Sequence, residues 1–580
     1  MTDTAAPVDA ISVALAYHQR TKHSLNGYAA GPDTLDWDAQ PDPFRRYVGA
    51  PLTALPLKAD SVTTGWADLF APGRIAPRAL DREALGLLFE LSFALSAWKQ
   101  YGPDRWAMRV NPSSGNLHPT EAWLLCQGAQ GVADGIHHYA PREHALEQRA
   151  SFAPASAGAH TANTTPRACI ALTSILWREA WKYGERAFRY CQLDVGHAIG
   201  ALRYAAAVLG WRLQPVACST AHIAALLGLD READFGAAER EEPDALFELL
   251  PYDAQGQNEI PFDWPVPTGW QGTPNRLDRH PMYRWPVIDA VAVATRVHAL
   301  SPDVGASLGG HAFCSVSPAR CAGSSFTCAE RTATQTLPEL HRSAQPATTL
   351  IRQRRSAQRF DARARMGLDP LWLLLRALHP DRLPFDAGPD QPRVHVLLFA
   401  HRVDGLAPGA YLLPRSAVGC GLLRHCLPTG LELTPVPDAP VDAPLLRLAE
   451  NPALAGTLRT LNCHQALGSD AILGFALLAE FNPLPDAAAY RERLQEAGLI
   501  GQALYLEAEA LGLRGTGIGC FFDDALHQLI GLPESAAASA PLQSVYHFTI
   551  GLPVSDARIT TEPPYAHLGP PVDQNPRSQP

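Results

Sequence analysis

The chain has 580 residues and a formal net charge of −10, with 46% hydrophobic and 18% charged residues. This balance is typical of a folded globular protein and excludes a disordered chain. The acidic excess argues against a broad contact with a nucleic-acid backbone, although a small anionic ligand could still bind in a local basic pocket.

The sequence contains no recognisable targeting or membrane segment. Met1–Pro7 has neither a basic region nor an apolar run, and no uninterrupted apolar stretch of about 18 residues occurs. Eleven cysteines without a CxxC pair are typical of reduced thiols. Cys314, Cys321 and Cys328 are evenly spaced, but their spacing matches no zinc or iron–sulfur pattern. We therefore expect a cytoplasmic protein without a metal site.

The first region is predicted to be one domain of mixed helices and strands at residues 1–299. A Pro-, Trp- and Gly-rich arm at about 255–290 is expected to be extended. In chain order the pattern predicts a helix over 80–99, a polar turn around 109–116, strands at 122–126, 135–139 and 168–176, and a long helix over 185–209.

The second region repeats this order of elements. Residues 300–345 lose periodicity and are predicted to be a linker, so that the second domain covers 346–580. The repetition argues for duplication with divergence. The predicted elements are a helix over 370–378, strands at 394–399, 410–413 and 472–478, and a long helix over 489–511.

The two long predicted helices share a pattern. Each is rich in Gly and Ala, apolar on nearly every side, and followed by a glycine, Gly210 or Gly512. Small residues permit close approach of backbones, so we expect both helices to be buried and packed against each other. Two unrelated core helices would explain the burial but not the shared pattern.

Three segments have the residue types of a ligand site. Arg354-Arg355-Ser356 offers two guanidinium groups and a hydroxyl for a phosphate, although arginine pairs are usually solvated. Pro112–Asn116 offers hydroxyls, an amide and free backbone groups in a turn. The glycines of Gly515–Gly519 follow a helix, which is the wrong order for a dinucleotide-binding loop. They either let the backbone approach a flat ligand or form a helix cap and turn.

Together these segments resemble the nitroreductase superfamily of FMN enzymes. Within it the chain looks like a SagB/ThcOx-type dehydrogenase in a tandem form, and Tyr17–His23 and Lys182–Tyr190 add to the resemblance. The resemblance implies an α+β fold of two α/β/α sandwich domains with mainly antiparallel central sheets. It also implies an intramolecular pseudo-dimer, because family members are usually homodimers with FMN at the interface.

The resemblance also implies roles for individual residues. One half would hold the phosphate end of FMN and line its ring, and the other half would reach the ring from the opposite side. The implied contacts are Arg354, Arg355, Ser356 and Arg558 for the phosphate, Gly517, Ile518 and Gly519 for the ring, and Pro112, Ser113, Ser114 and Asn116 from the other half.

Some departures from the family pattern point to a single site. Gln358 stands where the family often has a basic residue. The first half has no Arg-Arg-Ser segment at its own helix entry, and the second half has no Pro-Ser-Ser segment between Leu378 and Val394. Each half therefore lacks what the other keeps, and we expect one composite site.

Lys182 and Tyr183 are the candidate catalytic residues. In azoline-oxidising relatives a Lys-Tyr pair is associated with catalysis, and removal of two hydrogens needs a base beside the hydride acceptor. The alternative is a solvated helix start followed by Glu185 and Arg186. His197 is expected to be a packed or capping residue.

The sequence thus favours an FMN-dependent oxidoreductase of the dehydrogenase or oxidase type. Hydride would pass between a small or peptide-derived heterocyclic substrate and flavin N5, with other biosynthetic enzymes as candidate partners. One alternative is an NAD(P)H-dependent nitro or quinone reductase. Another is a degenerate, non-catalytic flavoprotein fold that serves as a subunit of a biosynthetic complex.

Overall fold

The computed structural model describes residues 9–71, 73–153, 165–252, 263–298, 342–428, 431–532 and 540–568. Cys314, Cys321 and Cys328, together with most of the predicted linker, lie outside these residues. Within them, no helix has both the length and the apolar character needed to cross a membrane.

The N-terminal half is built on an antiparallel sheet in the order β11-β7-β6-β5-β8-β10-β9, with β2 beside β7. Leu124 of β5 packs on the side of α2 and α4, whereas Trp123 and Leu125 pack on the side of α5. The bounds are β2 Leu52–Ala54, β5 Thr120–Gln127, β6 Gly135–Ala140, β7 Ala145–Phe152, β8 Arg167–Ser174, β9 Trp211–Pro215, β10 Glu242–Pro251, β11 Pro267–Thr268, α2 Arg82–Ser92, α3 Leu176–Tyr183, α4 Ala187–Val208, α5 Thr220–Leu227, α6 Glu232–Phe235 and α7 Pro286–Ala294.

The C-terminal half has a second antiparallel sheet, in the order β15-β16-β14-β13-β17-β19-β18. Leu398 of β13 packs on the side of α9 and α13, whereas Leu397 and Phe399 pack on the side of α10, α11 and α14. The bounds are β13 Val394–Ala400, β14 Gly409–Leu413, β15 Thr434–Pro435, β16 Leu446–Glu450, β17 Leu473–Glu480, β18 Arg514–Ile518, β19 Leu542–Gly551, α8 Ala347–Gln353, α9 Leu368–Arg376, α10 Ala417–Cys426, α11 Leu454–Leu461, α12 Leu467–Asp470, α13 Ala488–Ala510 and α14 Asp523–Ile530.

The two sheets repeat one topology, which confirms the predicted fold class. The order β7-β6-β5-β8-β10-β9 corresponds to β16-β14-β13-β17-β19-β18, and the long helices α4 and α13 occupy corresponding places. Each sheet is covered by helices on both faces, so each half is an α/β/α sandwich. The outermost strands β9 and β18, which follow the long helices, are therefore equivalent.

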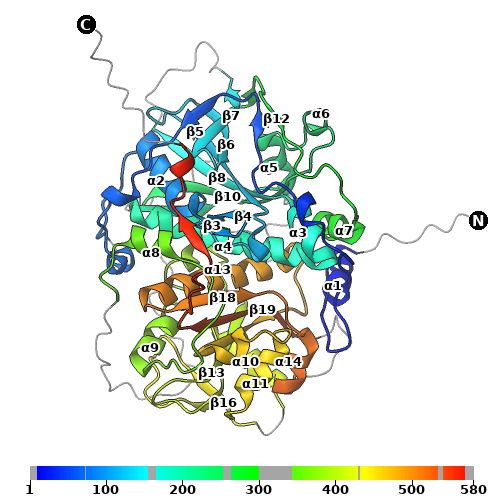
Figure 1. Cartoon of the computed structure of the whole chain (residues 1–580), viewed down its shortest axis with the longest axis vertical. Coiled ribbons are helices and arrows are strands. Elements are labelled where there is room, and N and C mark those ends of the chain that lie inside the picture. The colour runs from blue at the N-terminus through cyan, green and yellow to red at the C-terminus, as the bar shows by residue number, and fades with distance from the viewer. Residues whose placement is uncertain are drawn as a thin grey trace, which may run out of the picture.

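Helices α4 and α13 lie side by side where the two halves meet (Figure 1). They touch at two glycines in a reciprocal way. A Cβ on Gly196 would lie 2.0 Å from the carbonyl oxygen of Gln495, and one on Gly498 would lie 2.1 Å from that of Leu193. Because only glycine allows this approach, the small-residue pattern of the sequence is explained by direct backbone contact.

The chain ends cross between the halves. Strand β20 (Thr560–Glu562), near the C-terminus, pairs with β3 (Leu95–Tyr101) of the N-terminal half, and β3 pairs with β4 (Asp104–Arg109). Helix α1 (Ala10–Arg20) leads to Lys22, which forms an ion pair with Asp524 of the C-terminal half. Figure 1 shows the red C-terminal segment lying on the upper half.

The prediction of a helix over 80–99 is wrong in its second part. The helix ends at Ser92, and β3 begins at Leu95. The strand is stabilised by β20, more than 450 residues away in the chain, and no local pattern reports that partner. The predicted extended arm at about 255–290 contains only the two-residue strands β11 and β12 (Thr273–Pro274) over its described residues 263–285, and β12 pairs with β1 (Tyr47–Val48). Its last residues are helical instead, because α7 begins at Pro286.

Candidate functional site

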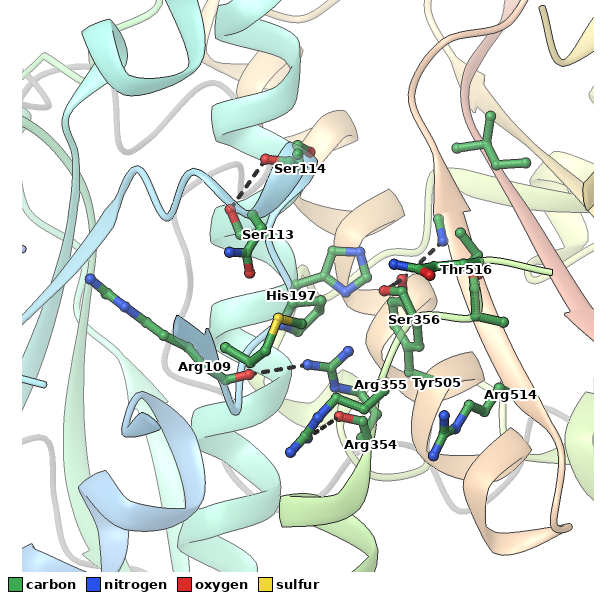
Figure 2. Close-up of a pocket in the computed structure, with 18 of the residues that line it drawn as sticks. Arg109, Ser113, Ser114, His197, Arg354, Arg355, Ser356, Tyr505, Arg514 and Thr516 are labelled. Carbon is green, nitrogen blue, oxygen red and sulfur yellow. Dashed lines mark hydrogen bonds between the residues drawn. The ribbon is translucent and has the colours of Figure 1, made fainter. Parts of the chain in front are cut away.

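A cavity of about 630 Å³ lies between the two halves. Figure 2 shows Ser113 and Ser114 on the N-terminal half, opposite Ser356 and Thr516 on the C-terminal half. The structure therefore brings the distant predicted segments together. The predicted residues in its wall are Pro112, Ser113, Ser114, Asn116, Tyr183, Arg354, Arg355, Ser356, Gly517, Ile518 and Gly519.

The turn 112–116 is held from behind by Asp194 of α4. The backbone N–H and the hydroxyl of Ser114 both donate to this carboxylate, at 3.0 and 2.9 Å. Gly115 has a φ of 58°, and a Cβ there would lie 2.5 Å from the hydroxyl of Tyr183. Burial raises the pKa of Asp194 to about 7, against the opposing hydrogen bonds from Ser113 and Ser114.

Arg354 and Arg355 of the C-terminal half both form hydrogen bonds with the N-terminal half. Arg354 is buried and donates from Nη2 and Nε to the carbonyl oxygen of Val110, at 2.9 and 3.2 Å. Arg355 donates from Nη2 to the carbonyl oxygen of Ser96 at 2.8 Å. Burial lowers the pKa of Arg355 to about 10, and the neighbouring Arg354 adds to this effect. Each guanidinium thus binds the N-terminal half while its charge stays at the cavity.

Two further cations stand beside this pair, Lys99 of β3 and Arg514 of β18. Burial lowers the pKa of Lys99, and the nearby charges of Arg355 and Arg514 lower it further. The carboxylate of Glu509 lies beside these cations and forms an ion pair with Arg514 at 3.3 Å. Positive charge therefore accumulates at this end, which favours an anionic ligand. Sequence reasoning missed both residues, because Lys99 fell in a predicted helix and Arg514 stood among glycines.

The glycine run is the strand β18 itself, at the edge of its sheet. Gly512 alone is the helix cap, with a φ of 72°. The other glycines make room for aromatic side chains of the cavity: a Cβ on Gly517 would lie 1.8 Å from the hydroxyl of Tyr546, and one on Gly519 1.9 Å from the ring of Tyr190.

Tyr505 of α13 joins the segments of the C-terminal half. Its hydroxyl pairs with the hydroxyl of Ser356 at 2.8 Å and accepts the backbone N–H of Gly517 at 3.0 Å. The guanidinium of Arg354 lies 5.0 Å from its ring centroid. A single side chain therefore fixes the Arg-Arg-Ser segment against β18. Sequence reasoning missed Tyr505, since a tyrosine on a buried helix gives no local signal.

The candidate catalytic residues differ in their placement. Tyr183 lines the cavity, and its ring packs 4.4 Å from that of Tyr190. Burial raises the pKa of Tyr183 well above its usual value, and Glu179 raises it further, so the phenol stays protonated. Lys182 does not appear among the described residues of the wall; its Nζ lies 5.3 Å from the ring of Trp37.

Arg558 is also absent from the described cavity wall. Its exposed guanidinium forms an ion pair with Asp556 at 2.7 Å, and Nη1 donates to the hydroxyl of Tyr101 at 3.3 Å. Asp556 itself lines the cavity. A role for Arg558 in holding a phosphate stays a prediction.

Among the described residues, four of the cavity wall each have a buried polar atom without a hydrogen-bond partner: Nε of Arg109, Oδ1 of Asn111, Nδ1 of His118 and Nδ1 of His197. The other ring nitrogen of His197 lies 3.0 Å from the hydroxyl of Tyr546. Burial lowers the pKa of His197 to about 3, and Arg354 adds to this effect, so the ring is neutral. Such unsatisfied groups are costly unless a polar ligand pairs with them.

The counterpart position in the other sheet is filled by protein. The segment before β13 places Asp386 against Arg203 of α4, whose Nη2 donates to it at 2.7 Å. Nη1 of Arg203 donates to the carbonyl oxygen of Trp211, the first residue of β9, at 3.2 Å. The equivalent edge strand is thus covered by residues 385–387.

A family model described as the nitroreductase family matches residues 83–237 and 436–551, one segment in each half. Each half of the chain therefore carries a segment that is similar to the nitroreductase family. Among solved structures, a nitroreductase candidate from Anabaena variabilis is 20% identical, with a TM-score of 0.63 over 93% of this chain and 99% of that one. A second candidate, from Ralstonia eutropha, is 20% identical over 38% of this chain and 90% of that one, with a TM-score of 0.25. No curated protein matches the chain.

The Anabaena likeness spans both halves of this chain, so the tandem fold as a whole has a solved counterpart. The match to the family model supports an oxidoreductase, in agreement with the expected class. Members of the family generally bind a flavin and use NAD(P)H.

Proposed function

We propose that the chain is an FMN-dependent oxidoreductase with one composite flavin site between its halves. The observation that carries this proposal is the shared cavity, whose wall includes Pro112–Asn116 from one half and Arg354–Ser356 and Gly517–Gly519 from the other. A site shared in this way requires both halves of the chain.

The residues present fit FMN. At one end, Lys99, Arg354, Arg355 and Arg514 offer a cationic setting for the phosphate. At the other, the hydroxyls and amides of the turn 112–116 suit the pyrimidine edge of a flavin, and the unpaired Oδ1 of Asn111 supports a polar ligand. The volume of about 630 Å³ lies within the range of small-molecule sites.

When bound, the flavin would supply hydride transfer at N5. The chain's own contribution would be proton handling and positioning. Tyr183, kept protonated by burial, would donate a hydrogen bond or proton toward the cavity. Lys182 would act beside it as the candidate base, since burial lowers the pKa of its ammonium group while Glu179 opposes this effect. Asp194 would position the turn through Ser114.

We propose dehydrogenation of a small or peptide-derived heterocycle as the reaction. The support is the Lys182–Tyr183 pair: Tyr183 lines the cavity, and Nζ of Lys182, the candidate base, lies 5.4 Å from the centroid of the Tyr183 ring. Reduction of nitroaromatics or quinones by NAD(P)H is the competing activity. Anaerobic mixing of the FMN-loaded protein with NADPH separates the two: a flavin that keeps its colour argues against the reductase.

The test of the composite site is the binding stoichiometry and its dependence on both halves. Purified protein is titrated with FMN and the bound flavin is counted by its absorption. We expect one FMN per chain, and loss of most of it in Ser113→Ala and in Arg355→Ala. Protein that stays colourless after addition of FMN, or either variant with full retention, would contradict the proposal.

A further inference from the structure

Two cysteines from different segments meet at the rim of the cavity. Cys520 directly follows Gly519 at the end of β18, and Cys463 lies in the turn after α11. Their Sγ atoms are 2.6 Å apart, although 57 residues separate them in the chain. Thiols brought so close are placed to form a disulfide with little movement of the backbone.

Hydrogen bonds of the neighbouring residues hold the two cysteine-containing segments close to each other. The N–H of Phe522 donates to the carbonyl oxygen of Leu461 at 2.8 Å, which ties the short segment between Cys520 and α14 to the end of α11. Gln465 donates from Nε2 to the carbonyl oxygen of Cys520 at 3.4 Å. Cys463 itself adopts a φ of 51°, a conformation rare for residues other than glycine. Fixed contacts on both sides thus maintain the approach of the two sulfurs.

The two thiols are not equivalent. Cys520 is part of the cavity wall, as is the adjacent Gly519. Its hydrogen bond with Cys463 lowers the pKa of Cys520, and His23 and Arg186 lower it further, against the effect of burial. The pKa of Cys463 is raised by the same bond. These directions favour Cys520 as the attacking sulfur of the pair, because the thiolate is the reactive form of cysteine.

The first half offers a natural comparison in Cys218. It follows β9 as Cys520 follows β18, and it packs against an apolar cluster of its own half. Burial raises the pKa of Cys218 to about 11. A cysteine at the equivalent place is thus an inert packed thiol, so the activation of Cys520 comes from its partner and surroundings.

We propose that Cys463 and Cys520 are a reversible dithiol–disulfide couple that exchanges two electrons with the flavin of the cavity and with a small thiol or disulfide outside it. The first exchange rests on the proposed function. Reduced flavin would give two electrons to the disulfide, which opens to two thiols as two protons are taken up, while the flavin becomes oxidised.

The second exchange needs no flavin. The Cys520 thiolate or its partner attacks one sulfur of an external disulfide, whose other half leaves as a thiol. The remaining cysteine then attacks the mixed disulfide, forms the Cys463–Cys520 bond and releases a second thiol. The couple is oxidised and the external disulfide is reduced to two thiols, so that atoms and electrons balance.

The first experiment tests the couple alone. The full chain is treated with oxidised glutathione, its free thiols are alkylated, and its peptides are mapped by mass. We expect a linked Cys463–Cys520 peptide pair that dithiothreitol separates again, both in the native sequence and in Cys218→Ser. Absence of the linked pair, or a link that dithiothreitol leaves intact in the folded protein, would overturn the couple.

The second experiment tests the exchange with flavin. Disulfide-form protein loaded with FMN is titrated anaerobically with dithionite, and Cys520→Ser is the matched variant. We expect the native sequence to need twice as much dithionite per flavin for complete bleaching, with Cys463 and Cys520 recovered as thiols. Equal titres would overturn the exchange. A protein that binds no FMN would instead contradict the proposed function, and the peptide map would still decide on the couple.

Discussion

Strands β18 and β9 occupy equivalent edges of the two sheets, yet they face different surroundings. β18 borders the cavity, whereas β9 is covered by residues 385–387 of the other half. On the helices before them, Tyr505 and Arg203 follow the paired glycines at the same interval. Tyr505 fixes Ser356 and Gly517 around the cavity, whereas Arg203 binds Asp386 and closes the corresponding space.

The difference shows how two sheets of the same topology can border a cavity at one edge and be covered by protein at the equivalent edge. The shared parts are the sheet order and the helix crossing, which stabilise both halves. The differing parts are a few side chains at the sheet edge. Gly515, Gly517 and Gly519 leave room for aromatic side chains on one side, whereas the buried Trp211 begins the other strand. The proposed flavin site would therefore depend on local differences within a shared frame.

The largest loss of stability is expected from substitutions at the contact between α4 and α13, where the two halves are most alike. In Gly196→Ala or Gly498→Ala the new Cβ meets a backbone oxygen, so the helices must separate. We expect each variant to lower the free energy of unfolding by about 3 kcal/mol, measured by urea denaturation. Gly456→Ala on the exposed face of α11 is the control, since no heavy atom lies within 4 Å of its Cβ. If the two variants lost clearly different amounts of unfolding free energy, the two helices would not be equivalent in this contact.

A smaller effect concerns Asp194, which supports the retained turn. Its pKa of about 7 is raised by burial from the usual 3.8, so the folded protein keeps a proton that the unfolded chain has lost. Its contribution to stability therefore falls as the pH rises from about 4 to 7. We expect Asp194→Asn to gain about 2 kcal/mol in unfolding free energy, relative to the native sequence, between pH 5 and 7. A pH-independent difference between the two proteins would refute this.

The cationic end provides a direct comparison of the two edge strands. Arg514 of β18 lines the cavity, and Arg212 of β9, which bonds Gln214 at 2.8 Å, is its counterpart. Loss of a charge-assisted contact with a phosphate should weaken FMN binding about tenfold in Arg514→Ala. Arg212→Ala should bind FMN as the native sequence does. Fluorescence titration measures both, and equal affinities in the two variants would argue against the phosphate end.

The smallest change in stability is expected at the Arg203–Asp386 ion pair, which fills the position beside β9. Arg203 and Asp386 form an ion pair, but the carboxylate is 39% exposed and solvent screens it. A double-mutant cycle with Arg203→Ala and Asp386→Ala should give a coupling free energy below about 1 kcal/mol. FMN binding should be unchanged in Asp386→Ala. Weakened binding there would mean that the filled position still supports a ligand.

Much of the frame could be predicted from local pattern. The strands at 394–399 and 410–413 and both long helices match the structure within a few residues, because their buried faces impose a clear periodicity. The contact between the helices also followed from their glycines. The joint placement of Pro112–Asn116 and Arg354–Ser356 was anticipated from the family resemblance.

The rest of the cavity depends on contacts that no local pattern encodes. Lys99 was hidden in a predicted helix because the pairing of β3 with the distant β20 leaves no signal in the local sequence. Tyr505 and His197 reach the cavity from helices that are buried on nearly every side, so amphipathicity does not mark them. The glycines of β18 are explained by Tyr546 and Tyr190, which come from distant elements.

The pairing of β20 with β3 also sets the order in which the protein can be completed during synthesis. Lys99 is synthesised early, whereas Thr561, whose hydroxyl accepts a hydrogen bond from it, is synthesised 462 residues later. The N-terminal half can begin to fold as it emerges, while this wall of the cavity must wait for the last segment. A ribosome stalled shortly before residue 560 would thus hold a nearly complete chain whose site is still open along one side.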